Sequence, residues 1–94
     1  MFVGTLTITI IIHDCSSLKD KRHVLHGVVE KIRKRFNISA AEVGNMDLWQ
    51  RATIGIAAVS NDRRVLNGLL DGVVDFLEKD DQFDVTEVVL ELDR

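Results

Sequence analysis

Four segments of the chain show the residue pattern of β-strands. Residues 2–13 alternate between apolar and small polar side chains and are rich in β-branched residues, and residues 51–60 and 85–92 repeat this period of two. A weaker segment of small residues, 38–43, precedes residues 51–60 and is expected to pair with them as a hairpin. The positions expected on the buried side are Leu6, Ile8, Ile10, Ile12, Ile54, Ile56, Ala58, Val88, Leu90 and Leu92.

Two further segments place apolar residues at three- and four-residue spacing, which predicts amphipathic helices. The first is expected to begin after Ser17, with Asp20 completing a weakened capping box, and to end at Asn37. The second is expected to begin after Asn61 as its N-cap and to end at Asp80. The apolar stripes consist of Leu18, Leu25, Val28, Val29, Ile32 and Phe36, and of Leu66, Leu69, Leu70, Val73 and Leu77.

The element order β-α-β-β-α-β has one common compact arrangement, the ferredoxin-like α+β sandwich, in which two helices cover one face of a four-stranded antiparallel sheet. We expect residues 1–94 to form this single domain, with the first and third strands at the centre of the sheet. We also expect these two central strands to run parallel. That direction would bring the N-termini of both helices to one end of the sheet.

Basic residues gather around the two predicted helix starts, where Ser17 and Asn61 would be the caps. They are Lys19, Lys21, Arg22, Arg63 and Arg64. Cations at a helix N-terminus oppose the helix dipole, so a bound anion would offset the conflict. Neutralisation by neighbouring acidic residues is the alternative; these are Asp14, Asp20 and Asp62. The predicted anion site is therefore the shared end of two helices.

The chain is acidic overall, with 15 Asp and Glu, 12 Lys and Arg and a formal net charge of −3, which identifies no class of partner. Seven of the basic residues nevertheless lie between Lys19 and Arg35, within the first predicted helix. The outer face of this helix is expected to carry Lys19, His23, His26, Lys31, Arg33 and Lys34. Such a face can contact the phosphates of RNA, and a merely solvated surface is the alternative.

The helix-free face of the sheet is expected to consist of small and β-branched residues, among them Thr7, Gly55 and Ala57. It lacks the stacking aromatic residues that an RNA-recognition motif of this topology would need. A flat surface of this kind suits sheet-to-sheet packing, which predicts a homodimer, and a water-exposed sheet is the alternative.

Trp49, the only tryptophan, precedes Gln50 and Arg51 at the start of the third strand. We expect it near the basic C-terminal turn of the first helix. There it would either close one end of the core or, with Gln50 and Arg51, anchor an interface with another protein.

Candidate groups for chemistry are few. Cys15 lies beside His13 just before a helix start, where a thiolate could be stabilised, yet spacing indicates neither an oriented base nor an oxyanion hole. His23 and His26 add two potential metal ligands without the close pairs of zinc motifs. We therefore expect no catalytic residue, metal or cofactor. The single cysteine and the lack of a signal or membrane-spanning pattern predict a cytoplasmic protein without membrane contact.

Five motifs along the chain are distinctive: Ser17-Leu18-Lys19-Asp20-Lys21-Arg22, Arg35-Phe36-Asn37-Ile38-Ser39, Ala41-Glu42-Val43, Asp47-Leu48-Trp49-Gln50-Arg51-Ala52 and Val59-Ser60-Asn61-Asp62. Together they resemble the YlxP-like family of small bacterial proteins, a domain of unknown function. The resemblance implies a ferredoxin-like fold and assigns no catalytic residue. It also implies, by association with genes for translation and ribosome-maturation factors, work near the ribosome or RNA.

These observations favour a non-enzymatic module that binds RNA, or another anion, in translation or ribosome maturation. One alternative is a small phosphoryl or acyl-phosphate enzyme, or a ligand-binding protein, that uses the paired helix N-termini, although the Gly- and Arg-rich first loop of acylphosphatases is absent. The other is a protein-interaction subunit anchored by Trp49.

Overall fold

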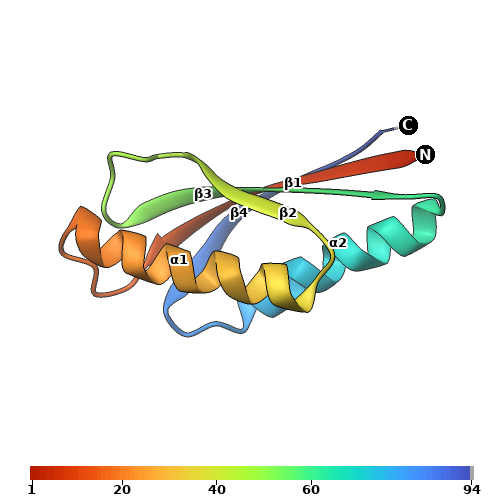
Figure 1. Cartoon of the computed structure of the whole chain (residues 1–94). Helices are drawn as coiled ribbons and strands as arrows, with labels where there is room; N and C mark the ends of the chain where they lie inside the picture. Colours follow the sequence, from red (N-terminus) through yellow and green to blue (C-terminus); the bar gives the residue numbers. More distant parts are fainter. Residues whose placement is uncertain (94) are drawn as a thin grey trace.

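The computed structural model describes residues 1–93 and contains six elements in the predicted order (Figure 1). The strands are β1 (Phe2–Ile12), β2 (Ser39–Gly44), β3 (Arg51–Ser60) and β4 (Phe83–Asp93), and the helices are α1 (Leu18–Arg35) and α2 (Arg63–Glu78). The β-α-β-β-α-β order confirms the predicted ferredoxin-like α+β fold, and the elements differ from the prediction only at their ends.

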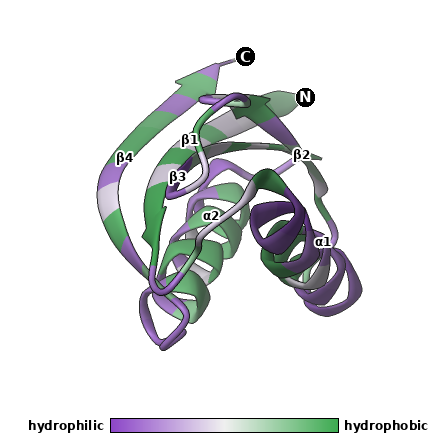
Figure 2. Cartoon of the chain, turned by 90° about the vertical axis from the view of Figure 1, so that its left-hand side faces the viewer, coloured by the Kyte–Doolittle hydropathy of each residue, from purple (hydrophilic) through white to green (hydrophobic). Residues whose placement is uncertain are grey.

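The four strands form one antiparallel sheet in the order β2-β3-β1-β4, and both helices cover one of its faces (Figure 2). The central neighbours are β1 and β3, as predicted, but they run antiparallel, with Leu6 opposite Ile56. The expectation that they run parallel is wrong. The β1-α1-β2 crossover makes β1 and β2 parallel, and the hairpin then reverses the chain into β3.

The two helices consequently begin at opposite ends of the sheet. Helix α1 begins beside the β2–β3 loop, whereas α2 begins at the end where the N-terminus of the chain lies (Figure 1). The predicted meeting of two helix N-termini therefore does not occur. Arg63 and Arg64, at the start of α2, are separated by the length of the sheet from Lys19 and Arg22, at the start of α1.

The core lies between the sheet and the two helices and contains the predicted apolar positions of β1, β3 and both helices except Leu18, at the first position of α1. Its fully buried side chains include Leu6, Ile8, Ile10, Ile54, Val28, Ile32, Leu66, Leu70, Val73 and Leu77. Burial of each large aliphatic side chain contributes about 1.5–3 kcal/mol of transfer free energy. At the far end of α1, the rings of Phe36 and Phe76 meet edge to face at 5.8 Å.

The apolar residues of β4 are less buried than the alternation of apolar and polar positions along this strand predicts. Val88 and Leu90 pair with Ile8 and Leu6 and so point to the helix side, yet both are exposed. The reason is the position of β4 at the edge of the sheet, where it curves away from the helices (Figure 2).

The two helix starts are capped by different groups. Ser17 is the N-cap of α1, as predicted, and its hydroxyl accepts a hydrogen bond from the Asp20 backbone N–H at 3.1 Å. Asn61 does not cap α2; the Asp62 carboxylate does, accepting from the backbone N–H groups of the second and third helical residues at 2.9 and 3.4 Å. A negative charge therefore already occupies the positive end of α2.

Candidate functional site

The cations that were expected to share one site fall into three separate environments. Ser17, Lys19 and Arg22 lie where α1 begins, whereas Asn61, Arg63 and Arg64 lie at the other end of the sheet. The third environment is the core, because Lys21 is buried. The anion site between two helix N-termini is thus not formed.

Lys21 is only 1% exposed and makes its contacts inside the protein. Its Nζ donates a hydrogen bond to the Asn45 carbonyl at 2.6 Å and lies 2.8 Å from Glu42 Oε2 in an ion pair. Glu42 comes from β2, on the side of the sheet that faces the helices. Lys21 therefore joins α1 to β2 and to the loop after it, and its charge is not available to an external anion.

Four cations on the outer half of α1 remain open to solvent: Lys19, Arg22, Lys31 and Lys34. Within residues 1–93, their side chains make no hydrogen bond or salt bridge with another residue. They span the solvent-exposed half of the helix, with Arg22 and Lys31 on its two flanks, and we call these four residues the α1 basic face. The other two arginines of α1, Arg33 and Arg35, make contacts within the protein.

Arg33 and Arg35 are held against the protein surface. Arg33 Nη2 donates to the Ala40 carbonyl at 2.6 Å, on the outer edge of β2, and Nη1 pairs with Glu30 at 3.1 Å. The Arg35 guanidinium lies 5.1 Å from the centre of the Phe76 ring. Arg33, predicted as a phosphate-binding residue, thus covers the backbone of an edge strand instead of pointing freely outward.

Charge is strongly segregated between α1 and the rest of the molecule. Residues 18–35 hold seven of the 12 Lys and Arg residues and two of the 15 Asp and Glu residues. The remainder has five basic and thirteen acidic residues. Figure 2 shows α1 as strongly hydrophilic on its outer turns. An anion approaching this protein is attracted by α1 and repelled by most other surfaces.

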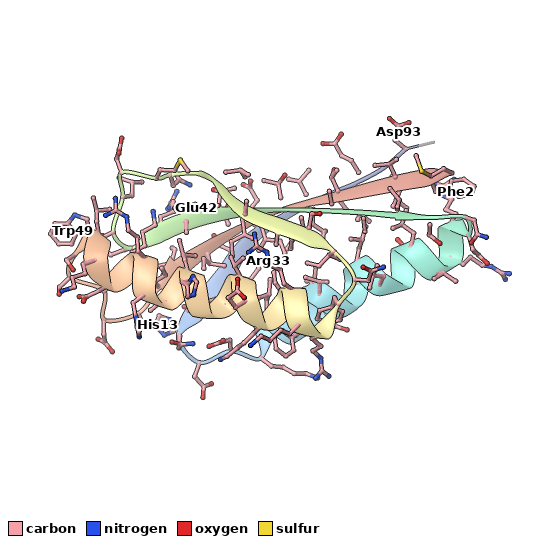
Figure 3. The ribbon with its side chains drawn as sticks, viewed as in Figure 1. Phe2, His13, Arg33, Glu42, Trp49 and Asp93 are labelled. Atoms are coloured by element: carbon pink, nitrogen blue, oxygen red, sulfur yellow. The ribbon has the colours of Figure 1, made fainter. Side chains whose placement is uncertain are left out.

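Trp49 lies beside the first turn of α1. The Cys15 thiol donates to the Trp49 carbonyl at 3.0 Å and also contacts the carbonyl of Ser17, the N-cap, at 3.4 Å. The expectation that Trp49 lies near the C-terminal turn of α1 is wrong, because the β2–β3 loop returns to the end of the sheet where β1 finishes (Figure 3). Trp49 is 47% exposed and is not part of the core.

The loop around Trp49, residues 45–50, is attached to the protein at several points. Besides the contacts of Lys21 and Cys15, the Asn45 amide donates to Thr53 Oγ1 at 2.8 Å and the Gln50 carbonyl accepts from the Ile12 N–H at 2.6 Å. Within the loop, the Leu48 N–H donates to the Asn45 carbonyl at 3.1 Å. We call residues 45–50 the Trp49 loop. It holds three large exposed apolar side chains, those of Met46, Leu48 and Trp49, on a fixed backbone.

The groups considered for chemistry are occupied by structural contacts. The Cys15 thiol is buried and donates to the carbonyls of Ser17 and Trp49, and within residues 1–93 it forms no hydrogen bond with His13. His13 instead pairs through Nε2 with Asp84 at 3.0 Å and through Nδ1 with the Asp81 carbonyl at 3.0 Å. The hydrogen bond to Asp84 and then the one to Asp81 raise the pKa of His13 above its ordinary value of 6.5. Both ring nitrogens face acceptors, which favours the imidazolium form.

No group of three or more His, Cys, Asp or Glu side chains suited to a metal ion occurs among residues 1–93. The two histidines of α1, His23 and His26, are exposed. In the same described part of the chain, no helix has the length and hydropathy needed to cross a membrane.

Two hollows lie near predicted interface residues. One of about 630 Å³ is lined by Ile11, Ile12, Asp14, Cys15, Leu48, Gln50 and Arg51, so Gln50 and Arg51 border a recess next to the Trp49 loop. The other, of about 480 Å³, lies on the helix-free face of the sheet and includes Thr7, Gly55 and Ala57 in its lining. Its surface is uncharged, and the predicted homodimer through this face stays a prediction.

Comparison with known proteins identifies the family. Residues 3–90 match the family described as "Protein of unknown function (DUF503)". The chain belongs to this family. It is also 40% identical over 76 residues to a Bacillus subtilis (strain 168) protein named "Uncharacterized protein YlxP", a match that covers 81% of this chain and 83% of that protein. The family membership expected from the sequence motifs is thereby confirmed.

Two contacts at the end of the DUF503 domain where α1 begins were not predicted from the sequence. The Lys21–Glu42 pair had a detectable signal, because Lys21 stands on the same helical stripe as Leu25, Val28 and Ile32 and therefore points inward. The bond from Cys15 to the Trp49 backbone had none, since it depends on how two loops meet.

Proposed function

We propose that this DUF503 protein is a non-enzymatic module that binds RNA through the α1 basic face. The observation that carries the proposal is the segregation of charge: an 18-residue helix concentrates the basic residues of an otherwise acidic chain. A helix that is merely solvated does not require its basic residues to be separated from acidic ones, because mixed signs along a helix stabilise it better. Binding of a polyanion to this face does require that separation.

The dimensions of α1 suit a nucleic-acid backbone. The helix is about 27 Å long at 1.5 Å per residue, and its unpaired cations extend from Lys19 to Lys34. Several consecutive phosphates can therefore contact the same helix. The acidic surfaces elsewhere orient the bound strand along α1, since other approaches are repulsive. The family resemblance favours an RNA of the translation apparatus as the ligand.

The acyl-phosphate alternative loses its structural basis. That hypothesis needs one anion held between two helix N-termini, and the antiparallel arrangement of β1 and β3 places those N-termini at opposite ends of the sheet. The Asp62 cap also places a carboxylate where the phosphate would approach α2.

The test is a charge-reversal comparison between two matched triple variants. One changes Lys19, Arg22 and Lys34 to Glu on the α1 basic face; the other changes Arg63, Arg64 and Lys79 to Glu, all exposed and all on or next to α2. Both variants alter the net charge equally. Affinity for a fluorescent mixed-sequence 12-nucleotide RNA is measured by anisotropy at several salt concentrations.

The first variant should lose roughly tenfold or more in affinity, and its plot of log K against log salt should flatten by about 2, because about 0.7 counterions are released per phosphate contact on a single strand. The second should change affinity far less. Equal losses in both variants, or wild-type binding that does not respond to salt, would refute the α1 site.

A further inference from the structure

We infer that the RNA on α1 is bound as a single strand and that one of its bases stacks on the exposed indole of Trp49. This inference rests on the proposed function and names its ligand class more narrowly. It arises from the position of the only tryptophan beside the first turn of the basic helix (Figure 3).

The Trp49 loop meets the first turn of α1 at the side chain of Cys15. A single sulfur atom, Cys15 Sγ, reaches both the Trp49 carbonyl at 3.0 Å and the Ser17 carbonyl at 3.4 Å. Ser17 caps the turn that carries Lys19 and Arg22, both exposed. A strand whose phosphates lie on these two cations therefore brings its bases within reach of the Trp49 loop.

The loop presents the indole on a rigid base. The backbone around Asn45 has a positive φ of 59° and is held by the buried Lys21 ammonium and by the Asn45 side chain on Thr53. Cys15 fixes the other end of the loop at Trp49. Little conformational entropy remains to be lost when a ligand covers the ring, which favours stacking on it.

The combination of a basic helix and an exposed aromatic ring distinguishes single-stranded from double-stranded RNA. Every base has a π-face that can stack on an indole, but a duplex keeps those faces inside its own stack. The absence of aromatic residues on the helix-free face of the described sheet leaves Trp49 as the stacking platform. Phosphate contacts alone would accept both forms of RNA, so the base contact is the source of discrimination.

Trp49 fluorescence provides a direct readout because the chain contains no other tryptophan. Titration with the single-stranded 12-mer should quench this emission, and titration with a 12-base-pair duplex should not. Trp49→Ala should lower affinity for the single strand roughly 5- to 150-fold, the range expected for one stacked base, with an unchanged salt slope. Trp49→Phe should retain most of the affinity.

Met46→Ala is the matched control, because it removes another exposed apolar side chain from the same loop. It should leave RNA affinity unchanged. The melting temperature of each variant shows whether the fold is retained, and quenching of Trp49 emission in the wild-type protein keeps the test valid if Trp49→Ala proves unstable.

The outcomes separate this inference from the proposed function. If charge reversal on α1 abolishes RNA binding while Trp49→Ala and Trp49→Phe bind like wild type, stacking is refuted and the proposed function stands. If no RNA binds at any salt concentration, both fail. If Trp49→Ala instead abolishes a nuclease-resistant complex with a protein and leaves RNA affinity intact, stacking is refuted and Trp49 belongs to a protein interface.

Discussion

The two ends of the sheet look alike in sequence and differ in structure. Each presents a helix start with a cap and two exposed cations, Lys19 and Arg22 at one end and Arg63 and Arg64 at the other. Only the α1 end adds the Trp49 loop, held there by Lys21 and by the Cys15 thiol. The α2 end carries an anionic cap, the Asp62 carboxylate, and no comparable aromatic loop is held beside its first turn among the described residues.

This difference shows that a helix start with nearby cations does not define a binding site. The local pattern is the same at both ends, and the long-range contacts decide which end gains further recognition groups. At the α1 end the long-range contacts are made by the side chains of Lys21 and Cys15. Replacing such side chains should therefore affect the α1 end and leave the α2 end unchanged.

The largest effect is expected from Lys21→Met. Removing the ammonium leaves Glu42 without its partner on the helix side of the sheet and releases the Asn45 carbonyl. We expect a loss of about 2–4 kcal/mol in the free energy of unfolding, somewhat less than for a fully buried pair because Glu42 keeps a side-chain exposure of 21%. Urea unfolding followed by Trp49 fluorescence measures it.

Two further variants make this prediction sharper. Lys31→Met, on the exposed side of the same helix, should change stability by no more than about 0.5 kcal/mol. The double variant with Lys21→Met and Glu42→Leu should recover part of the loss, since no charge is left unpaired. A Lys21→Met variant as stable as Lys31→Met would show that the bond to the Trp49 loop contributes nothing.

The fold was predictable because the pattern of each element is strong and agrees with its neighbours. The alternation in β1 and β3 and the apolar stripe of α2 each match the buried positions observed. Strand direction was mispredicted, since periodicity contains no information on it. Only the hairpin between β2 and β3, which was itself predicted, determines that β3 must oppose β1.

The candidate site was less predictable than the fold. The exposed cations of α1 follow from helical spacing, as Lys19, Lys31 and Lys34 show. The inward position of Lys21 follows from the helical stripe, but its partner Glu42, a carboxylate 21 residues away, does not. The position of Trp49 depends on where the β2–β3 loop returns, and such long-range pairings leave no periodic signal in one sequence.

A smaller effect is expected from the two helix caps. Ser17→Ala and Asp62→Ala should each cost about 1 kcal/mol, because each removes the acceptor for backbone N–H groups at a helix start. Their response to salt should differ. The Asp62 contribution includes attraction between a charge and the helix dipole, so it should shrink between 0.05 and 1 M salt, roughly the range over which the Debye length falls below 10 Å.

Chemical denaturation with urea at each salt concentration measures both costs. The cost of Ser17→Ala should stay constant, since a neutral hydroxyl is the acceptor. The same salt dependence for both variants would mean that the two helix starts are electrostatically equivalent, which would weaken the contrast between the two ends of the sheet.

The smallest effect concerns His13, which joins the end of β1 to the start of β4 through Asp84 and Asp81. Its pKa is raised in the folded state, chiefly by the hydrogen bond to Asp84. A raised pKa stabilises the fold fully below the unfolded value of 6.5, and this contribution is lost as pH rises through the folded pKa. Besides Asp84, the charged residues that line the hollow around His13 are Glu78, Asp80 and Asp81, and these acidic groups favour the same protonated form.

Stability measured by urea unfolding from pH 5.5 to 9 should therefore fall across this range in the wild type and fall less in His13→Gln. His23→Gln is the control, because His23 is exposed on α1 and makes no hydrogen bond within the described residues. A wild-type slope retained in His13→Gln would assign the pH dependence to another group. If His23→Gln instead removed the pH dependence of stability, the responsible group would lie on α1. The His13 contact between β1 and β4 would then be excluded as its source.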